Sequence, residues 1–255
     1  MIGKLDGIIP EGTMKNKIRC WYWNNFGEND FKIYFQEGLW KILHKNGLSF
    51  KFFENPYPYF RDVRYYFRHY KLKKGDNVVD GGAYPGDFAM YAAKIVYPGK
   101  VISFEPDPEN YKKTLKNIKL NNIKNIIAIK KALYNKGCAV NFSNTQGGDA
   151  SISETGKIKV ETIRLDEELK KLKIKKIDFI KMDIEGAELK SIIGCKETLK
   201  NNPKCELAIA SYHIVNGEPT TIRLERSLKE MGFETITIGP EHPTTFGFNH
   251  DGVGK

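Results

Sequence analysis

The sequence predicts an α/β fold, with a mostly parallel sheet covered by helices on both faces. Two observations lead to this prediction. From Lys74 onward, short apolar runs that suit buried strands alternate with segments of helical spacing. The first apolar run is followed by a glycine-rich turn and then a helical segment. Right-handed crossovers between parallel strands place helices on both faces, and ligands bind at the carboxyl ends of the strands.

The predicted elements follow one another with short connections. Strands are expected at 77–80, 100–106, 126–133, 177–183, 205–211 and 233–239. Helices are expected at 86–96, 107–122, 166–173, 186–200 and 220–231. Two further β segments, 138–143 and 158–165, flank a polar loop, and the last apolar stretch, 244–250, is expected to be an antiparallel edge strand.

Residues 1–73 differ from residues 74–255, which we interpret as the main domain. The first segment is rich in aromatic residues, has no clean period, and is interrupted by Pro56 and Pro58. It predicts short strands with one or two helices, and most of its aromatic side chains are expected to fill a small core. We interpret it as an N-terminal extension that packs on the main domain and serves as a candidate lid or substrate-binding segment.

Composition favours a soluble cytoplasmic protein. The 255 residues are 40% hydrophobic, no apolar run approaches the roughly 18 to 20 residues of a membrane span, and no secretory signal opens the chain. The net charge of +10 leaves RNA binding open, but most lysines lie on expected solvated helix faces and turns.

No C-x-x-C pair is present, so free thiols are expected at Cys20, Cys138, Cys195 and Cys205. The oligomeric state is not predicted.

The turn after the first strand reads DGGAYPG, from Asp80 to Gly86. A phosphate-binding P-loop is excluded because no Gly-Lys-Ser/Thr follows. A dinucleotide site is disfavoured because Ala83 replaces the middle glycine of its pattern. An S-adenosylmethionine site tolerates D-x-G-x-x-x-G, which Asp80, Gly82 and Gly86 match. A strand–helix turn without a ligand stays open.

Acidic residues follow two other strands. Glu105, in FEPDP, lies about 20 residues beyond the glycine turn, where a carboxylate can accept hydrogen bonds from ribose hydroxyls in NAD and S-adenosylmethionine sites alike. In KMDIEGAE, Asp183, Glu185 and Glu188 lie within six residues. Such a group needs a partner such as a sulfonium, an amino group or a divalent metal. Asp183 and Glu185 are therefore an alternative Mg²⁺ site.

His213 follows the strand at 205–211, where a general base would be placed. Histidine titrates near neutral pH and can take a proton from a hydroxyl. A structural role for this residue is equally open at this point.

Five stretches taken together resemble the FkbM-type family of S-adenosylmethionine-dependent methyltransferases: VVDGGAYPGDF, VISFEPDPENYKKTLKNIKLNN, KKALYNKG, VETIRLDE and IDFIKMDIEGAELKSIIG. The resemblance covers roughly residues 74–231. It implies a Rossmann-like, seven-stranded class I methyltransferase fold. It also implies S-adenosylmethionine as cofactor and O-methylation, often of a hydroxyl on a sugar or other small molecule.

The resemblance also assigns residues by position. It implies a cofactor turn of Asp80, Gly82, Ala83 and Gly86, a ribose contact in Glu105 and Pro106, an adenine contact in Ala132 and Leu133, and roles near the methyl group for Asp183 and His213. The family's turn usually reads Gly-Ala-Asn-x-Gly, whereas this chain has Tyr84 and Pro85 at the Asn-x positions.

The leading hypothesis is therefore an O-methyltransferase in which His213 or Asp183 removes the hydroxyl proton. An RNA methyltransferase is the first alternative, motivated by the basic charge and the aromatic N-terminal segment. A binding protein that keeps the fold without catalysis is the second, motivated by Tyr84-Pro85. An NAD enzyme ranks last.

Overall fold

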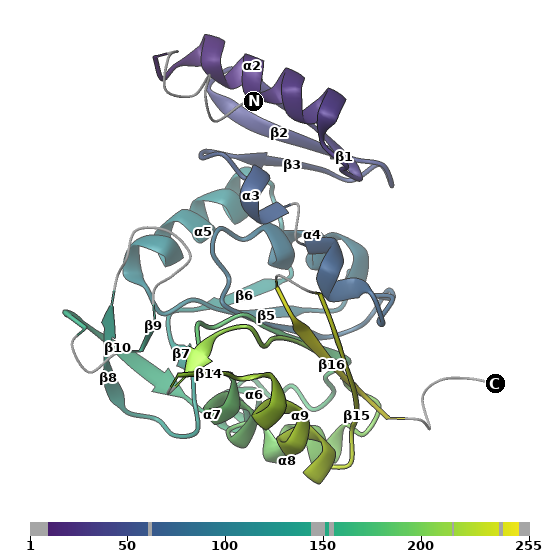
Figure 1. The fold of residues 1–255 in the computed structure, drawn as a ribbon, viewed down its shortest axis with the longest axis vertical. Helices are drawn as coiled ribbons and strands as arrows, with labels where there is room; N and C mark the ends of the chain where they lie inside the picture. The colour runs from purple at the N-terminus through teal and green to yellow at the C-terminus, as the bar shows by residue number, and fades with distance from the viewer. Residues whose placement is uncertain are drawn as a thin grey trace.

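The computed structural model describes residues 10–60, 63–143, 151–152, 156–215, 217–239 and 242–249. At its centre is a seven-stranded sheet (Figure 1). In spatial order its strands are β15 (Glu234–Ile238), β16 (Thr244–Phe248), β12 (Glu206–Ala210), β11 (Phe179–Met182), β4 (Val78–Gly81), β5 (Val101–Phe104) and β6 (Ile126–Ile129). The predicted α/β class with a mostly parallel sheet is confirmed.

The strands β4, β5 and β11 are buried over their full length. Their continuous apolar runs suit a sheet that is covered on both faces. The pairs β4–β5, β4–β11, β5–β6 and β11–β12 are parallel, so their carboxyl ends meet at one edge. That edge is where the glycine turn and KMDIEGAE are brought together.

The expectation of an antiparallel edge strand at the end of the chain is half right. Strand β16 is antiparallel to both its neighbours, but it lies between β15 and β12 rather than at the edge. Its residues from Thr244 to Gly247 are buried, as expected for a strand inside a sheet that is covered on both faces. In chain order β15 comes first and forms the edge of the sheet. The chain then turns back, and β16 pairs with both β15 and β12.

Helices cover both faces of the sheet (Figure 1). The helix α4 (Asp87–Val96) packs on one face, where Phe88 and Ala92 join a core with Val78 and Phe179. The other face carries α6 (Leu165–Lys171), α7 (Glu188–Ile193), α8 (Lys196–Asn201) and α9 (Thr221–Glu230), which share a second core with the sheet. The helix α5 (Pro108–Leu120) begins with Asp107 as N-cap and Pro108 at its first position, as the sequence indicates.

One predicted helix and one predicted strand are divided in the structure. The helix expected at 186–200 is split into α7 and α8 around Gly194. A Cβ at Gly194 would lie only 2.1 Å from the carbonyl oxygen of Tyr134, so close packing at this point occupies the space that a side chain would need. The strand expected at 126–133 leaves the main sheet after Ile129 and resumes as β7 (Ala132–Leu133).

A smaller sheet is formed by β7 with three more strands. The strands β8 (Ala139–Ser143) and β10 (Ile158–Ile163) pair antiparallel, as the two β segments around the polar loop indicate, and β9 (Ser151–Ile152) pairs with β8. A short hairpin of β13 (Ile214–Val215) and β14 (Glu218–Pro219) follows the main-sheet strand β12.

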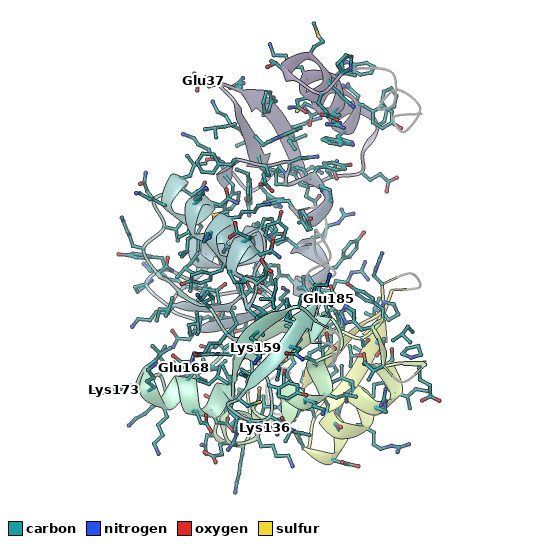
Figure 2. All side chains as sticks on the ribbon, turned by 90° about the vertical axis from the view of Figure 1, so that its left-hand side faces the viewer. Glu37, Lys136, Lys159, Glu168, Lys173 and Glu185 are labelled. Atoms are coloured by element: carbon teal, nitrogen blue, oxygen red, sulfur yellow. The ribbon has the colours of Figure 1, made fainter. Side chains whose placement is uncertain are left out.

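The N-terminal segment contains α2 (Thr13–Phe26) and a three-stranded antiparallel sheet of β1 (Phe31–Gln36), β2 (Leu39–His44) and β3 (Ser49–Phe52). A short helix α3 (Tyr57–Phe60) and a 3₁₀ helix η1 (Val63–Phe67) lead into the main domain. Figure 1 shows α2 and this sheet at one end of the molecule, and Figure 2 shows Glu37 at the far tip of the β1–β2 turn. As expected, aromatic side chains fill its core, including Phe31, Trp40, Phe50, Phe52 and Phe60.

Hydrogen bonds attach this segment to α5. The Asn121 side chain accepts from the Lys51 amide at 2.8 Å and donates to the Lys51 carbonyl at 2.7 Å. The Asn117 side chain accepts from the Phe53 amide at 3.3 Å. The segment is thus held against the C-terminal half of α5. Within the described ranges, no helix is both long and apolar enough to cross a membrane.

Candidate functional site

A cavity of about 1060 Å³ lies at the carboxyl edge of the main sheet. Its walls come from the turns after β4, β5, β11 and β12, from the strands β7, β8, β15 and β16, and from the N-terminal segment. Pockets for drug-sized ligands typically occupy about 300–1,000 Å³, so this cavity has room for a nucleoside-bearing cofactor together with an acceptor.

Within the glycine turn, Gly82 lines the cavity. Its φ is +78°, and an added Cβ would lie 1.9 Å from the carbonyl oxygen of Asp183, so glycine is required here. The other turn residues predicted to bind the cofactor lie behind this wall: Asp80 and Ala83 are buried outside the cavity lining, and Gly86 is the N-cap of α4 with φ of +97°.

The side chain of Lys181 binds both a carboxylate and two backbone carbonyl groups of the glycine turn. Its Nζ lies 3.0 Å from Asp80 Oδ1 and donates to the carbonyl oxygens of Gly81 at 3.1 Å and Gly82 at 2.7 Å. Burial alone would lower the pKa of Lys181, but Asp80 and the neighbouring carboxylates outweigh this and raise it. Lys181 lies in the KMDIEGAE stretch, but a pattern within that stretch cannot show its role, because its partner Asp80 lies 101 positions away.

Glu105 lines the cavity with 6% of its surface exposed. It accepts backbone hydrogen bonds from Tyr84 at 3.1 Å and Asp107 at 3.0 Å, one on each carboxylate oxygen. Each oxygen keeps a further lone pair for a ligand hydroxyl. Burial raises the pKa of Glu105 to about 7, although the two amides oppose the shift.

Tyr84, where the family pattern has asparagine, connects the cavity to the N-terminal segment. Its backbone amide binds Glu105, and its hydroxyl donates to Glu54 at 3.1 Å. Its ring lies 5.4 Å from that of Tyr59 in an edge-to-face arrangement. An apolar wall adjoins Glu105 and consists of Pro106, Ala132 and Leu133, all predicted from the sequence, with Phe104 and Phe142.

Asp183 is bound by two phenols at the cavity wall. Tyr66 donates to Oδ2 at 2.8 Å and Tyr212 donates to Oδ1 at 3.3 Å. Burial and the Asp183 charge raise the pKa of both phenols, so both remain protonated donors at neutral pH. Sequence reasoning did not find Tyr66, which lies in η1 and is separated from Asp183 by 117 positions.

His213 lies next to Asp183, with Nε2 3.5 Å from Oδ1, but it does not line the cavity. Its Nδ1 is 2.8 Å from Glu188 Oε1, and its Nε2 is 3.3 Å from Glu185 Oε2 and 3.5 Å from Asp183 Oδ1. Burial would lower the pKa of His213, but these carboxylates together raise it to about 10. Figure 2 shows Glu185 between the N-terminal segment and the C-terminal strands.

The N-terminal wall of the cavity is aromatic and cationic. Arg68 lies over the ring of Tyr65, with its guanidinium carbon 4.6 Å from the ring centroid, and Arg64 lies 5.2 Å from the same centroid. Tyr57 and Tyr59 complete this wall. The cavity is therefore lined by both carboxylates and cations, with Arg64 and Arg68 on its N-terminal side.

Comparison with known proteins finds a matching family. Residues 80–235 match the family model described as the methyltransferase FkbM domain. The chain is 26% identical over 195 residues to "Methyltransferase sdnD" of Sordaria araneosa, an overlap that covers 62% of this chain and 73% of that protein.

Two solved structures are similar to this chain. A fibrillarin described as a pre-rRNA processing protein of Methanococcus jannaschii has a TM-score of 0.50 and 15% identity, covering 86% of this chain and 98% of that one. A fibrillarin of Aeropyrum pernix with natively bound S-adenosylmethionine has a TM-score of 0.49 and 12% identity, covering 86% of this chain and 99% of that one. The main domain has the class I methyltransferase fold.

Proposed function

Because the chain belongs to the FkbM methyltransferase family, we propose that it transfers the methyl group of S-adenosylmethionine to a hydroxyl of a sugar or other small molecule. The observation that supports this most is Asp183. It is a carboxylate at the cavity wall, fixed by Tyr66 and Tyr212 and adjacent to the glycine turn. It can accept the proton that a hydroxyl loses on methylation.

The proposed cofactor position follows the cavity wall. Glu105 accepts hydrogen bonds from the ribose hydroxyls, and the adenine packs against Pro106, Ala132 and Leu133. Because Gly82 has no side chain, the methionine part of S-adenosylmethionine can approach the backbone of the turn closely. In this assignment Asp80, Ala83 and Gly86 shape the turn without touching the cofactor, and Lys181 fixes it.

The reaction is an in-line displacement. The acceptor oxygen forms a bond to the methyl carbon while the carbon–sulfur bond breaks, which leaves a methyl ether and S-adenosylhomocysteine. The hydroxyl proton passes to Asp183 and then to solvent. The protein contributes mainly by aligning the two reactants. We assign His213 to positioning rather than to proton removal, because it does not border the cavity and its Nε2 faces Asp183 and Glu185.

The acceptor is proposed to lie between Asp183 and the N-terminal wall. The rings of Tyr57, Tyr59 and Tyr65 offer flat surfaces against which a sugar ring can pack, and Arg64 and Arg68 offer hydrogen-bond donors. This places substrate selection in residues 1–73, the segment that we interpret as an extension of the main domain.

A labelled-methyl assay tests the proposal. The purified protein is incubated with methyl-labelled S-adenosylmethionine and fractionated cell extract, and the labelled product is analysed for its methylated atom. We expect a methyl ether, with turnover reduced about 10²- to 10⁴-fold in Asp183→Asn. Label on nitrogen or carbon, or full turnover in Asp183→Asn, contradicts it. Glu37→Gln, which alters an exposed carboxylate outside the cavity lining, is the matched control.

RNA is the second candidate acceptor. The net charge of +10 and the cavity-lining Arg64, Arg68 and Lys131 favour it, because phosphates pair with such side chains. Binding of a short single-stranded RNA at low salt, weakening steeply as salt rises, would support this candidate. Absence of binding at low salt would remove it.

A further inference from the structure

Asp183, Glu185 and His213 each present one metal-ligating atom, and these three atoms lie within 4.8 Å of one another. We propose that they bind a divalent transition-metal ion such as Zn²⁺, Fe²⁺ or Mn²⁺. Asp183 and Glu185 come from the turn after β11, and His213 comes from the end of β12. The parallel pairing of these two strands brings the three side chains to one point.

The distances between the ligand atoms suit a metal. With bonds of about 2.1 Å, a tetrahedral ion separates its ligand atoms by about 3.4 Å. In the structure, His213 Nε2 lies 3.3 Å from Glu185 Oε2 and 3.5 Å from Asp183 Oδ1. Two of the three separations between the ligand atoms therefore match those around a tetrahedral ion.

The surroundings of His213 provide a second, independent observation. Only 8% of the residue is exposed. Each ring nitrogen has a carboxylate oxygen within 3.5 Å, but at angles that do not make a regular hydrogen bond. A fully buried carboxylate, Glu188, lies 2.8 Å from Nδ1 and leaves Nε2 directed at Asp183 and Glu185. Metal-bound histidines are commonly oriented in this way, by a carboxylate on the nitrogen that does not bind the metal.

The type of ligands indicates the class of metal. Imidazole suits Zn²⁺ and Fe²⁺, and carboxylates suit Mn²⁺, so one imidazole with two carboxylates fits this group. Mg²⁺, which the sequence suggested for Asp183 and Glu185, prefers oxygen ligands and retained waters, and the comparisons give it no support. The inclusion of His213 therefore changes the expected ion.

The proposed metal would face the cavity on one side only. Asp183 and Glu185 line the cavity, whereas His213 lies behind them, so free coordination positions would point inward. There the ion could bind and orient an acceptor oxygen. This last consequence rests on the proposed function, whereas metal binding itself does not.

Titration of tag-free, chelator-treated protein with Co²⁺, a spectroscopic substitute for these ions, tests the inference. We expect one equivalent to bind with visible ligand-field absorption. Glu185→Gln and His213→Gln should abolish that signal. Glu188→Gln should weaken binding about 10- to 100-fold, as loss of an orienting carboxylate does. His44→Ala, which alters a histidine in the N-terminal sheet, is the matched control.

Two results would overturn the inference: no Co²⁺ binding by folded wild-type protein, or binding that is unchanged in both Glu185→Gln and His213→Gln. Circular dichroism shows whether each variant is folded, and Glu185→Gln alters a partly exposed side chain, so it carries little risk for the fold. The proposed function is tested separately. Methyl transfer by a protein that binds no Co²⁺ would leave the proposed function standing and overturn the metal site. Co²⁺ binding without methyl transfer would leave the metal site standing and overturn the proposed function.

Discussion

Lys181 and Asp80 form a buried ion pair directly across the neighbouring strands β11 and β4, with Nζ 3.0 Å from Oδ1. Lys181 also donates to two carbonyl oxygens of the glycine turn, so one cation satisfies the carboxylate and fixes the turn. Removal of either partner leaves the other charge buried and unpaired, which typically costs about 3–5 kcal/mol.

The variant Lys181→Met should therefore lower the free energy of unfolding by about 3–5 kcal/mol. The double variant Lys181→Met with Asp80→Asn should lose less than the sum of the two single variants, because neither partner is left unpaired. Urea unfolding of the four proteins measures this. Strictly additive losses would show that the pair does not act as a unit.

The contact between Tyr66 and Asp183 predicts an effect on turnover. Tyr66→Phe removes the hydroxyl that donates to Asp183 at 2.8 Å, and hydrogen bonds to charged groups contribute about 1.5–3 kcal/mol. We expect kcat to fall about tenfold or more while the affinity for S-adenosylmethionine changes little. Tyr70→Phe, which removes a 2.9 Å bond to Asp76 outside the cavity lining, is the control. Equal kcat in both variants would contradict the role of Tyr66.

The conformation at Gly82 predicts the effect of a single methyl group. Gly82→Ala should abolish binding of S-adenosylmethionine, because its Cβ would lie 1.9 Å from the carbonyl oxygen of Asp183. Gly47→Ala is the matched control. Gly47 also has positive φ, +86°, but open space around it, so only a strain of about 1–2 kcal/mol is expected. Calorimetry on both variants decides the point, and normal binding by Gly82→Ala would contradict the prediction.

The pKa of Glu105 predicts opposite pH effects on stability and on binding. Burial raises this pKa from 4.5 to about 7, so in that range the folded protein holds a proton that the unfolded chain releases. The contribution of Glu105 to stability should thus fall as pH rises from about 4.5 to about 7. Binding of S-adenosylmethionine should strengthen over the same range, because ribose hydroxyls donate to the carboxylate form.

Unfolding and calorimetric titration at about pH 5 and about pH 8 measure both effects. Glu105→Gln is the control, because it keeps the shape of the side chain and removes its titration. The same pH dependence in wild type and Glu105→Gln would assign the effects to other groups.

The sequence was sufficient to predict much of the fold, because that information is local, and several residues that it singled out line one cavity. Strand–helix alternation, the glycine turn and the spacing to Glu105 all lie within short stretches. Gly82, Glu105, Pro106, Ala132, Leu133 and Asp183 line one cavity in the structure. The order of strands is not local, so the insertion of β16 between β15 and β12 could not be predicted.

The missed residues depend on long-range contacts. Tyr66 reaches Asp183 from the N-terminal segment, where aromatic side chains that fill a core cannot be told by pattern from those that line a cavity. The position of His213 after its strand was predictable, but its burial behind Asp183 and Glu185 was not, because that depends on how the turn after β11 folds.

Calorimetric titration of the purified protein with S-adenosylmethionine tests the central claim most directly. We predict one bound molecule per chain, with affinity reduced at least about tenfold by Glu105→Ala through loss of the two ribose hydrogen bonds, and unchanged in His44→Ala. Absence of binding by folded wild-type protein would contradict the account and would favour a protein that keeps the fold without catalysis.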